Sequence, residues 1–378
     1  MTASIRTLDR QTLNRALLAR QRLLKRVDQP PAQVIEHLVA LQAQEVTDPY
    51  VALWSRTEGF DPMSLSDMLA ERQVVRGQLL RATIHLVTAS DALIMRPILQ
   101  PVLERHMTPR SLFGRRLVEA GVDAAEVTAA GSALLDAEPR TRAELRKLLG
   151  ERWPHADGTA LAQAVTYLVP VVQVPPRGLW RRSGQARWAL LESWLDKPMV
   201  VDASPDGLVL RYLAAFGPAT AADVREWSGL PGAAQILDRL RPRLRVYLDE
   251  HGRELLDLAD GQLPDPETPA PVRFLPVYDN VGLGHADRSR IIDEHHRKRL
   301  LTLDMISFGS ILVDGFGRAI WRVDRDRATR SAALDVALLE PLDGRDIDAI
   351  GAEGERLLTF LEPDVATREV RFRHLSTA

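Results

Sequence analysis

The chain has 378 residues, 45% of them apolar and 26% charged, a composition typical of a soluble globular protein with about two to four small domains. It contains no cysteine, which excludes disulfides, thiolate metal sites and a cysteine nucleophile. The net charge of −2 argues against a generic nucleic-acid binder, because proteins that neutralise phosphates usually carry an evident basic excess.

Membrane and export signals are missing from the sequence pattern. No window approaches the roughly 18 consecutive apolar residues that a membrane-spanning helix needs, and the stretch from Met1 to Arg10 lacks the apolar core of a signal peptide. We therefore expect a cytoplasmic protein without membrane association.

The basic residues are almost all arginine and are unevenly distributed. Guanidinium groups suit bidentate contacts with phosphate better than ammonium groups do. Solvated surfaces encoded by a GC-rich genome, in which arginine replaces lysine, would give the same pattern. The clusters are Arg20, Arg22, Arg26; Arg140, Arg142, Arg146; Arg177, Arg181, Arg182, Arg187; Arg239, Arg241, Arg243, Arg245; and Arg288, Arg290, Arg297, Arg299.

The N-terminal part, residues 1–115, has the pattern of helices followed by a strand pair. Apolar residues recur at helical spacing in three segments, and two segments rich in β-branched residues follow them. This order predicts a winged helix. The expected helices are Asp9 to Leu24, Ala32 to Leu41 and Ser64 to Arg72, and the expected strands are Val74 to Leu79 and Ala82 to Val87.

Residues 116–200 repeat this order. Thr141 begins a helix with Glu144 at the capping-box position, and a second helix is expected from Ala160 to Leu168. The segments Val171 to Val174 and Ala186 to Leu191 are expected to pair across a turn-rich loop. This is a second predicted winged helix, with a longer wing.

Residues 201–262 show the winged-helix pattern most clearly. A helical stripe ends at Gly217-Pro218, Thr220 caps a second helix with Asp223 three residues on, and a third helix carries Ile236 and Leu240. Two strands, Arg245 to Leu248 and Glu254 to Leu258, then flank a glycine turn. Three helices followed by a hairpin predict a third winged helix.

The composition changes in residues 263–378, which begin with a proline-rich linker. We expect a β-rich domain there and an α+β fold for the whole chain. Its expected elements are strands Ile306 to Val313 and Arg318 to Val323 around the turn Asp314-Gly315-Phe316-Gly317, a helix Ala349 to Glu362 and a strand Glu369 to Arg373.

Two amides stand one residue apart in Leu41-Gln42-Ala43-Gln44-Glu45, shortly before Asp48-Pro49. On a regular helix, residues i and i+2 point to nearly opposite sides, so the two amides converge only if the helix ends near Leu41. Taken alone, such a pair fits two polar residues at a helix end more readily than a catalytic site.

Longer blocks around this pair carry a family resemblance. Leu41 to Glu45 with Pro49 to Arg56, then Arg81 to Val87, then Phe274 to Asn280 with His285 to Arg290, resemble the AlkZ/YcaQ family of winged-helix DNA glycosylases. The resemblance spans nearly the whole chain. It implies tandem winged helices and a C-terminal β domain arranged as a C-shaped cradle for duplex DNA.

The family's catalytic motif is Gln, an apolar residue, then Gln or Asp, which the resemblance carries over to Gln42 and Gln44 as catalytic residues. The Gln/Gln branch, typified by AlkZ, is associated with self-resistance to DNA-alkylating antibiotics. Further candidates for DNA contact are Arg56, Arg81, Thr83, His85, His285 and Arg288. A buried structural role is an equally good interpretation of His85.

Amides are weak catalysts, and this restricts the substrate. Ordinary glycoside hydrolysis needs a carboxylic acid for the leaving group and a carboxylate for the water. An N7-alkylguanine, or an N3-alkyladenine, is already cationic and departs neutral, so holding water and stabilising the oxocarbenium-like transition state are sufficient. We therefore predict a DNA glycosylase for cationic alkylpurines, including bulky or crosslinking lesions, with water held jointly by Gln42 and Gln44. Glu45 and Asp48 are nearby carboxyls, although Asp48 before Pro49 better fits a cap or turn.

Other chemistry is not expected. No lysine is near the Gln pair, so a Schiff-base lyase step is unexpected and the enzyme should be monofunctional. The spacing of His285, Asp287, His295 and His296 fits no standard metal site, and we expect neither metal nor cofactor. The expected partner is double-stranded DNA bearing alkylated purines, bound by a monomer.

Two other functions remain open from the sequence. Tandem winged helices also occur in transcriptional regulators that bind DNA without chemistry. A protein that sequesters a free antibiotic is the third alternative.

Overall fold

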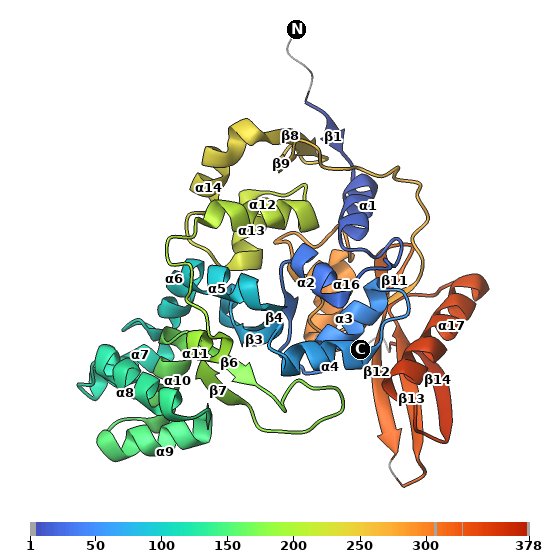
Figure 1. Cartoon of the computed structure of the whole chain (residues 1–378). Helices are drawn as coiled ribbons and strands as arrows, with labels where there is room; N and C mark the ends of the chain where they lie inside the picture. The colour runs from blue at the N-terminus through green and yellow to red at the C-terminus, as the bar shows by residue number, and fades with distance from the viewer. Residues whose placement is uncertain (1–4, 306–307, 327, 376–378) are drawn as a thin grey trace.

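The computed structural model describes residues 5–305, 308–326 and 328–375 and contains three separate β-sheets surrounded by helices (Figure 1). The helices of residues 116–200 gather at one end, and the C-terminal sheet with its helix α17 lies at another (Figure 1). Among the described residues, no helix combines the length and apolar character required to cross a bilayer.

The central sheet joins the wings of the first two predicted winged helices. Its strand order is β2-β4-β3-β6-β7-β5, and β3 pairs antiparallel with β6, placing Arg76 opposite Gln173. The two predicted hairpins therefore form one continuous surface. Its strands are β2 (Leu41–Gln42), β3 (Val74–Gln78), β4 (Ile84–Thr88), β5 (Arg140–Thr141), β6 (Val171–Val174) and β7 (Arg187–Leu190).

In the first unit the predicted strands are present, but the helix expected from Ala32 to Leu41 ends at His37. The chain then passes through Val39 with a positive φ of 71°, which no helix tolerates, and Leu41 enters β2 opposite Leu86. A helix at Asp48, with Pro49 in its first turn, was not predicted. The helices are α2 (Pro31–His37), α3 (Asp48–Arg56), α4 (Pro62–Ala70), η1 (Leu80–Ala82), α5 (Ala89–Ile98), α6 (Gln100–Glu104) and η2 (Arg105–Met107).

The second unit contains both predicted helices and both predicted strands. Thr141 and Glu144 form the predicted capping box, with the Thr141 hydroxyl accepting from the Glu144 amide at 3.1 Å. The helices are α7 (Leu112–Glu119), α8 (Ala124–Ala137), α9 (Arg142–Arg152), α10 (Gly158–Leu168) and α11 (Leu191–Leu195).

The third unit also follows the predicted order, and Thr220 with Asp223 forms the second capping box. The N-terminal elements pack against this unit, because β1 pairs in parallel with β8 and Arg20 forms a buried ion pair with Asp257 at 2.6 Å. The packing therefore crosses the predicted division at residue 115. The elements are β1 (Thr7–Leu8), α1 (Arg10–Arg20), α12 (Pro205–Phe216), α13 (Ala221–Ser228), α14 (Ala233–Leu240), η3 (Arg241–Arg243), β8 (Leu244–Asp249) and β9 (Glu254–Leu258).

The C-terminal part is the predicted β-rich unit. Its hairpin turn is Asp314-Gly315, where both residues have positive φ, of 45° and 83°, as a two-residue turn requires. Of the predicted strand Ile306 to Val313, residues 306–307 lie outside the described residues. The elements are β10 (Arg273–Leu275), α15 (Asn280–Leu283), α16 (Glu294–Thr302), β11 (Gly309–Val313), β12 (Phe316–Asp326), β13 (Ser331–Leu338), α17 (Gly344–Leu361) and β14 (Thr367–His374).

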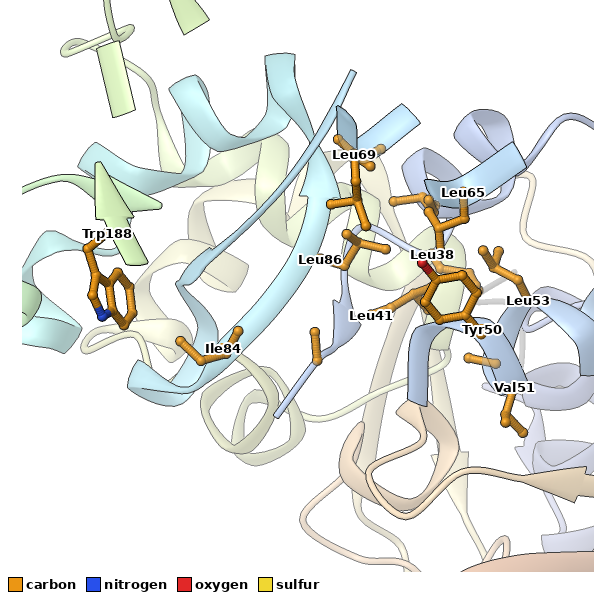
Figure 2. Packing of buried hydrophobic residues seen from close by; sticks show 14 of the residues in the cluster. Leu38, Leu41, Tyr50, Val51, Leu53, Leu65, Leu69, Ile84, Leu86 and Trp188 are labelled. Atoms are coloured by element: carbon orange, nitrogen blue, oxygen red, sulfur yellow. The ribbon is translucent and has the colours of Figure 1, made fainter. Parts of the chain in front are cut away.

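The largest hydrophobic core connects the first, second and C-terminal units. Figure 2 shows side chains of α3 and α4, including Tyr50 and Leu65, facing those of β2 and β4, including Leu41 and Leu86. The segment that carries Gln42 and Gln44 is thus fixed on one side by buried apolar packing.

Candidate active site

Gln42 and Gln44 lie at the edge strand of the central sheet, not at a helix end. Gln42 is the last residue of β2 and stands opposite His85 of β4. The Ala43 amide continues the pairing by donating to the Ile84 carbonyl at 2.8 Å, and the chain bends at Gln44. A strand end, which breaks the regular alternation of side chains, replaces the predicted helix end.

The Gln42 side chain is buried, with 7% of its surface exposed, and its oxygen is occupied. Arg81 Nη2 donates to Gln42 Oε1 at 2.6 Å, and Arg81 Nη1 donates to the Trp227 carbonyl. Arg81 lies in η1 between β3 and β4 with a positive φ of 52°. Burial lowers the pKa of Arg81 to about 10, which leaves it charged at neutral pH. A cation therefore fixes the orientation of the Gln42 amide.

Gln44 is exposed and lines a cavity of about 430 Å³. Its Oε1 accepts only a long contact, 3.5 Å, from the Ile84 amide. Arg76 holds the backbone between the two glutamines, because its Nη2 donates to the Ala43 carbonyl at 2.7 Å. The cavity is lined by Gln44, Arg76, Gln78, Ala82, Thr83, Ile84, Arg142, Tyr167, Gln173, Arg177 and Ala186.

The C-terminal segment from Phe274 to Asn280 contacts both ends of the segment that carries Gln42 and Gln44. Asn280 Nδ2 donates to the Ala40 carbonyl at 3.0 Å, and the Tyr278 amide lies 3.4 Å from the Asp48 carboxylate. This support was not predicted from the sequence, since these residues are more than two hundred positions from the loop. The similarity of this block to the glycosylase family was the available signal.

Asp48 is a buried carboxyl at the start of α3, with 4% of its surface exposed. Burial raises its pKa to about 7, and the nearby carboxylates Glu45 and Asp279 act in the same direction. The Asp48 side chain is thus partly protonated at neutral pH. Glu45, in contrast, is exposed.

His85 and Thr83 stand directly beside the amide pair. His85 is 1% exposed, and burial, reinforced by the charge of Arg81, lowers its pKa to about 3. Its Nδ1 lies 3.0 Å from the Thr83 carbonyl, so the ring is neutral and structurally held. Thr83 lines the cavity with Gln44, and its hydroxyl donates to the Leu80 carbonyl at 3.2 Å.

Comparison with known proteins identifies the family of the chain. The family model described as "DNA glycosylase AlkZ-like" matches residues 35–360, which include β2, the cavity and most of the C-terminal unit. The chain belongs to the AlkZ-like DNA glycosylase family. It is a DNA glycosylase of DNA repair, and its substrate is DNA. A non-catalytic regulator, the alternative kept open by the sequence, is therefore set aside.

A solved structure agrees in fold with this glycosylase. The chain is similar to the solved structure of the Streptomyces sahachiroi DNA glycosylase AlkZ, with a TM-score of 0.74 and 19% identity, and the match covers 97% of this chain and 100% of that chain. At this identity the match shows the shared fold alone. No curated protein matches the sequence.

Three of the six predicted DNA contacts of the glycosylase, namely Arg56, His85 and His285, are interior residues. Arg56 is fully buried and forms a two-pronged ion pair with Asp279, with both N to O distances at 2.8 Å. His285 is 1% exposed, its Nε2 lies 3.1 Å from the Phe216 carbonyl, and burial together with Arg290 lowers its pKa to about 3. For Arg56 and His285 the expectation of DNA contact is corrected, because neither side chain reaches the surface, and His85 has the buried position that its structural interpretation expected.

Arg288, the remaining predicted contact, is half-buried and lies 3.6 Å from Glu226 of α13. Glu226 and Arg288 both influence the charge of Arg81, the first stabilising its cation and the second opposing it. The structure therefore groups Gln42, Arg81 and His85 closely, places Gln44 and Thr83 on the adjoining cavity, and sets Arg288 beyond Arg81.

Proposed function

We propose that this glycosylase hydrolyses the N-glycosidic bond of cationic N7-alkylguanine in duplex DNA, and of N3-alkyladenine by the same chemistry. The observation that carries the proposal is the donor set beside Gln44, in which the cavity is lined by amides and arginines, and none of its lining residues is acidic. A neutral base would need an acid to leave, whereas a cationic base departs without one.

The contacts of the two amides support a division of roles. Gln42 Oε1 already accepts from Arg81, which uses one of its two lone pairs, and the buried amide keeps its NH2 group and dipole to present. Gln44 has only the 3.5 Å contact from Ile84 and faces the cavity. Gln44 then accepts the hydrogen bond of the attacking water, and Gln42 orients the sugar or the water from the buried side.

The reaction is proposed to stop at the abasic site. Schiff-base formation requires a lysine amine within reach of the sugar carbon, and no lysine lines the cavity beside Gln44. The enzyme is monofunctional, works as a monomer in the cytoplasm, and includes bulky or crosslinking antibiotic adducts among its substrates, which connects it to self-resistance as well as to general repair. The proposal also includes the binding of duplex DNA in a C-shaped cradle formed by the three winged helices and the C-terminal β domain.

Base release from methylated duplex DNA tests the proposal. The protein should release 7-methylguanine, and Gln42→Ala, Gln44→Ala should each reduce the single-turnover rate by about a hundredfold or more while duplex binding is retained. Arg371→Gln, on the exposed edge strand β14, is the matched control with unchanged activity. Absence of release from any N7-alkylated duplex would overturn the proposal, and tight binding of free drug without DNA would favour sequestration instead.

A further inference from the structure

The cavity beside Gln44 contains polar groups that the proposed chemistry does not use. It lies where β3 of the first unit pairs with β6 of the second, and this pairing places Arg76 and Gln173 opposite each other. Gln78, two residues after Arg76 on the same strand, shares their face of the sheet. Side chains from two units thus converge on one volume of about 430 Å³.

Three of these buried side chains have an atom without a hydrogen-bond partner among the described residues: Arg76 Nε, Gln78 Oε1 and Gln173 Oε1. Their side chains are 2%, 4% and 8% exposed. Buried polar atoms are normally paired, and each orphan is costly. Arg76 Nε lacks an acceptor, and a half-turn of either amide would put an NH2 donor in the place of its unpaired oxygen, so a ligand with acceptor atoms would supply the missing partners.

The charge of the cavity indicates the ligand. Arg76, Arg142 and Arg177 line it, and no acidic residue does. Burial lowers the pKa of Arg76 to about 10 and the charge of Arg177 acts in the same direction, yet Arg76 remains a cation at neutral pH. Such a volume attracts an anion.

We propose that this cavity binds one backbone phosphate of the DNA strand, adjacent to the lesion nucleotide, so that the sugar under attack lies at Gln44. Arginine guanidinium groups match the geometry of phosphate oxygens. A half-turn of the terminal amide of Gln78 or Gln173 presents its NH2 group to the same anion. The position of this phosphate next to the reacting sugar rests on the proposed function, whereas the binding of the phosphate does not.

Neutralising single phosphates tests the site. The probe is a duplex with a tetrahydrofuran abasic-site analogue, in which one phosphate at a time near the analogue is replaced by an uncharged methylphosphonate. Affinity for the wild-type protein should fall about tenfold at one position flanking the analogue and less elsewhere. Because this measurement uses the unaltered protein, it does not depend on how a variant folds.

A double variant assigns the effect to the cavity. Arg142 is exposed and Arg177 half-buried, so Arg142→Gln combined with Arg177→Gln should leave the fold intact. This variant should bind the ordinary duplex about tenfold more weakly than the wild-type protein. A methylphosphonate at the sensitive position should cause it no further loss of affinity, and the slope of log affinity against log salt concentration should decrease in magnitude by about one. The control Arg371→Gln should keep the full methylphosphonate effect.

The inference would be overturned if the affinity lost by the double variant and the affinity lost through the methylphosphonate added up at every position. It would also be overturned if the wild-type protein were insensitive to each single methylphosphonate. A double variant that no longer discriminates between the bases placed opposite the analogue, but still loses affinity at the sensitive methylphosphonate position, would also overturn it, since the cavity would then hold a base. The coupling is the non-additive effect of the double variant and the methylphosphonate at the sensitive position. If it is absent while 7-methylguanine is released normally, only this inference is lost. If coupling is found but no base is released, the proposed function fails and the phosphate site stands.

Discussion

The guanidinium group of Arg81 donates to the side-chain oxygen of Gln42 at 2.6 Å, across 39 positions of the sequence. Arg81 is one of the candidates for DNA contact, and in the structure its guanidinium group also donates to the Trp227 carbonyl. A partly buried cation that donates to the carbonyl oxygen favours a single orientation of the amide. Arg81 is therefore a positioning residue for Gln42.

Replacing Arg81 with methionine should slow base release by about a hundredfold, the usual cost of a misplaced catalytic group, with little change in duplex affinity. Single-turnover rates and duplex binding measure the two effects separately. Arg81→Lys should recover part of the rate, because an ammonium group still donates. A contact that serves only DNA binding would instead weaken affinity and leave the single-turnover rate at saturating protein unchanged.

The ion pair of Arg56 with Asp279 anchors α3 to the C-terminal segment that supports the Gln42 loop. Arg56→Met leaves a buried carboxylate unpaired and should destabilise the protein by about 3–5 kcal/mol, seen as a lower urea midpoint. Arg56→Met combined with Asp279→Asn keeps the cap on the Val281 amide, which lies 3.1 Å from Asp279 Oδ1, but removes the charge. This double variant should be more stable than the single one, and equal or lower stability would contradict a charge-based anchor.

Asp48 should make stability fall as the pH rises. Its pKa is raised from 3.8 to about 7, so the stabilisation present below pH 3.8 is lost as the pH approaches and passes 7. Asp48→Asn mimics the protonated carboxyl and removes this dependence. The melting temperature of the variant, relative to that of the wild-type protein, should rise between pH 5 and pH 8. A constant difference would show that the carboxyl titrates normally.

His85 and His285 should act in the opposite direction. Burial lowers the pKa of each from 6.5 to about 3, so the stabilisation present above pH 6.5 is lost as the pH falls towards 3. Each imidazole contributes a loss of about 1.4 kcal/mol per pH unit over that interval. His85→Gln should make acid unfolding less steep, while His155→Gln, at an exposed position, should not change it. Equal slopes for both variants would contradict a buried neutral His85.

Local signals in the sequence predicted most of the helices and wings, because their causes lie within a few residues. The capping boxes of Thr141 with Glu144 and of Thr220 with Asp223 span three residues each, and both are present. Strand β2 was missed because its cause is distant, namely pairing with β4 more than forty residues later. The joining of the two wings through β3 and β6 has the same origin.

The candidate site shows the same limit. The family resemblance located Gln42 and Gln44, but which amide is free depends on Arg81 and on the cavity, and neither has a local signature. Arg56 resembles any surface arginine in the sequence, since the partner that buries it is 223 positions away. Asp48 followed by Pro49 has the pattern of a turn, whereas tertiary packing turns it into a buried carboxyl at a helix start.

Under the proposed function, weak amides suffice because the lesion activates its own departure. The most direct measurement compares single-turnover release of 7-methylguanine and of hypoxanthine, a neutral purine lesion, from otherwise identical duplexes. We predict measurable release of 7-methylguanine that depends on Gln44, and no release of hypoxanthine above background. Comparable release of both bases, or release of 7-methylguanine that Gln44→Ala leaves unchanged, would contradict it.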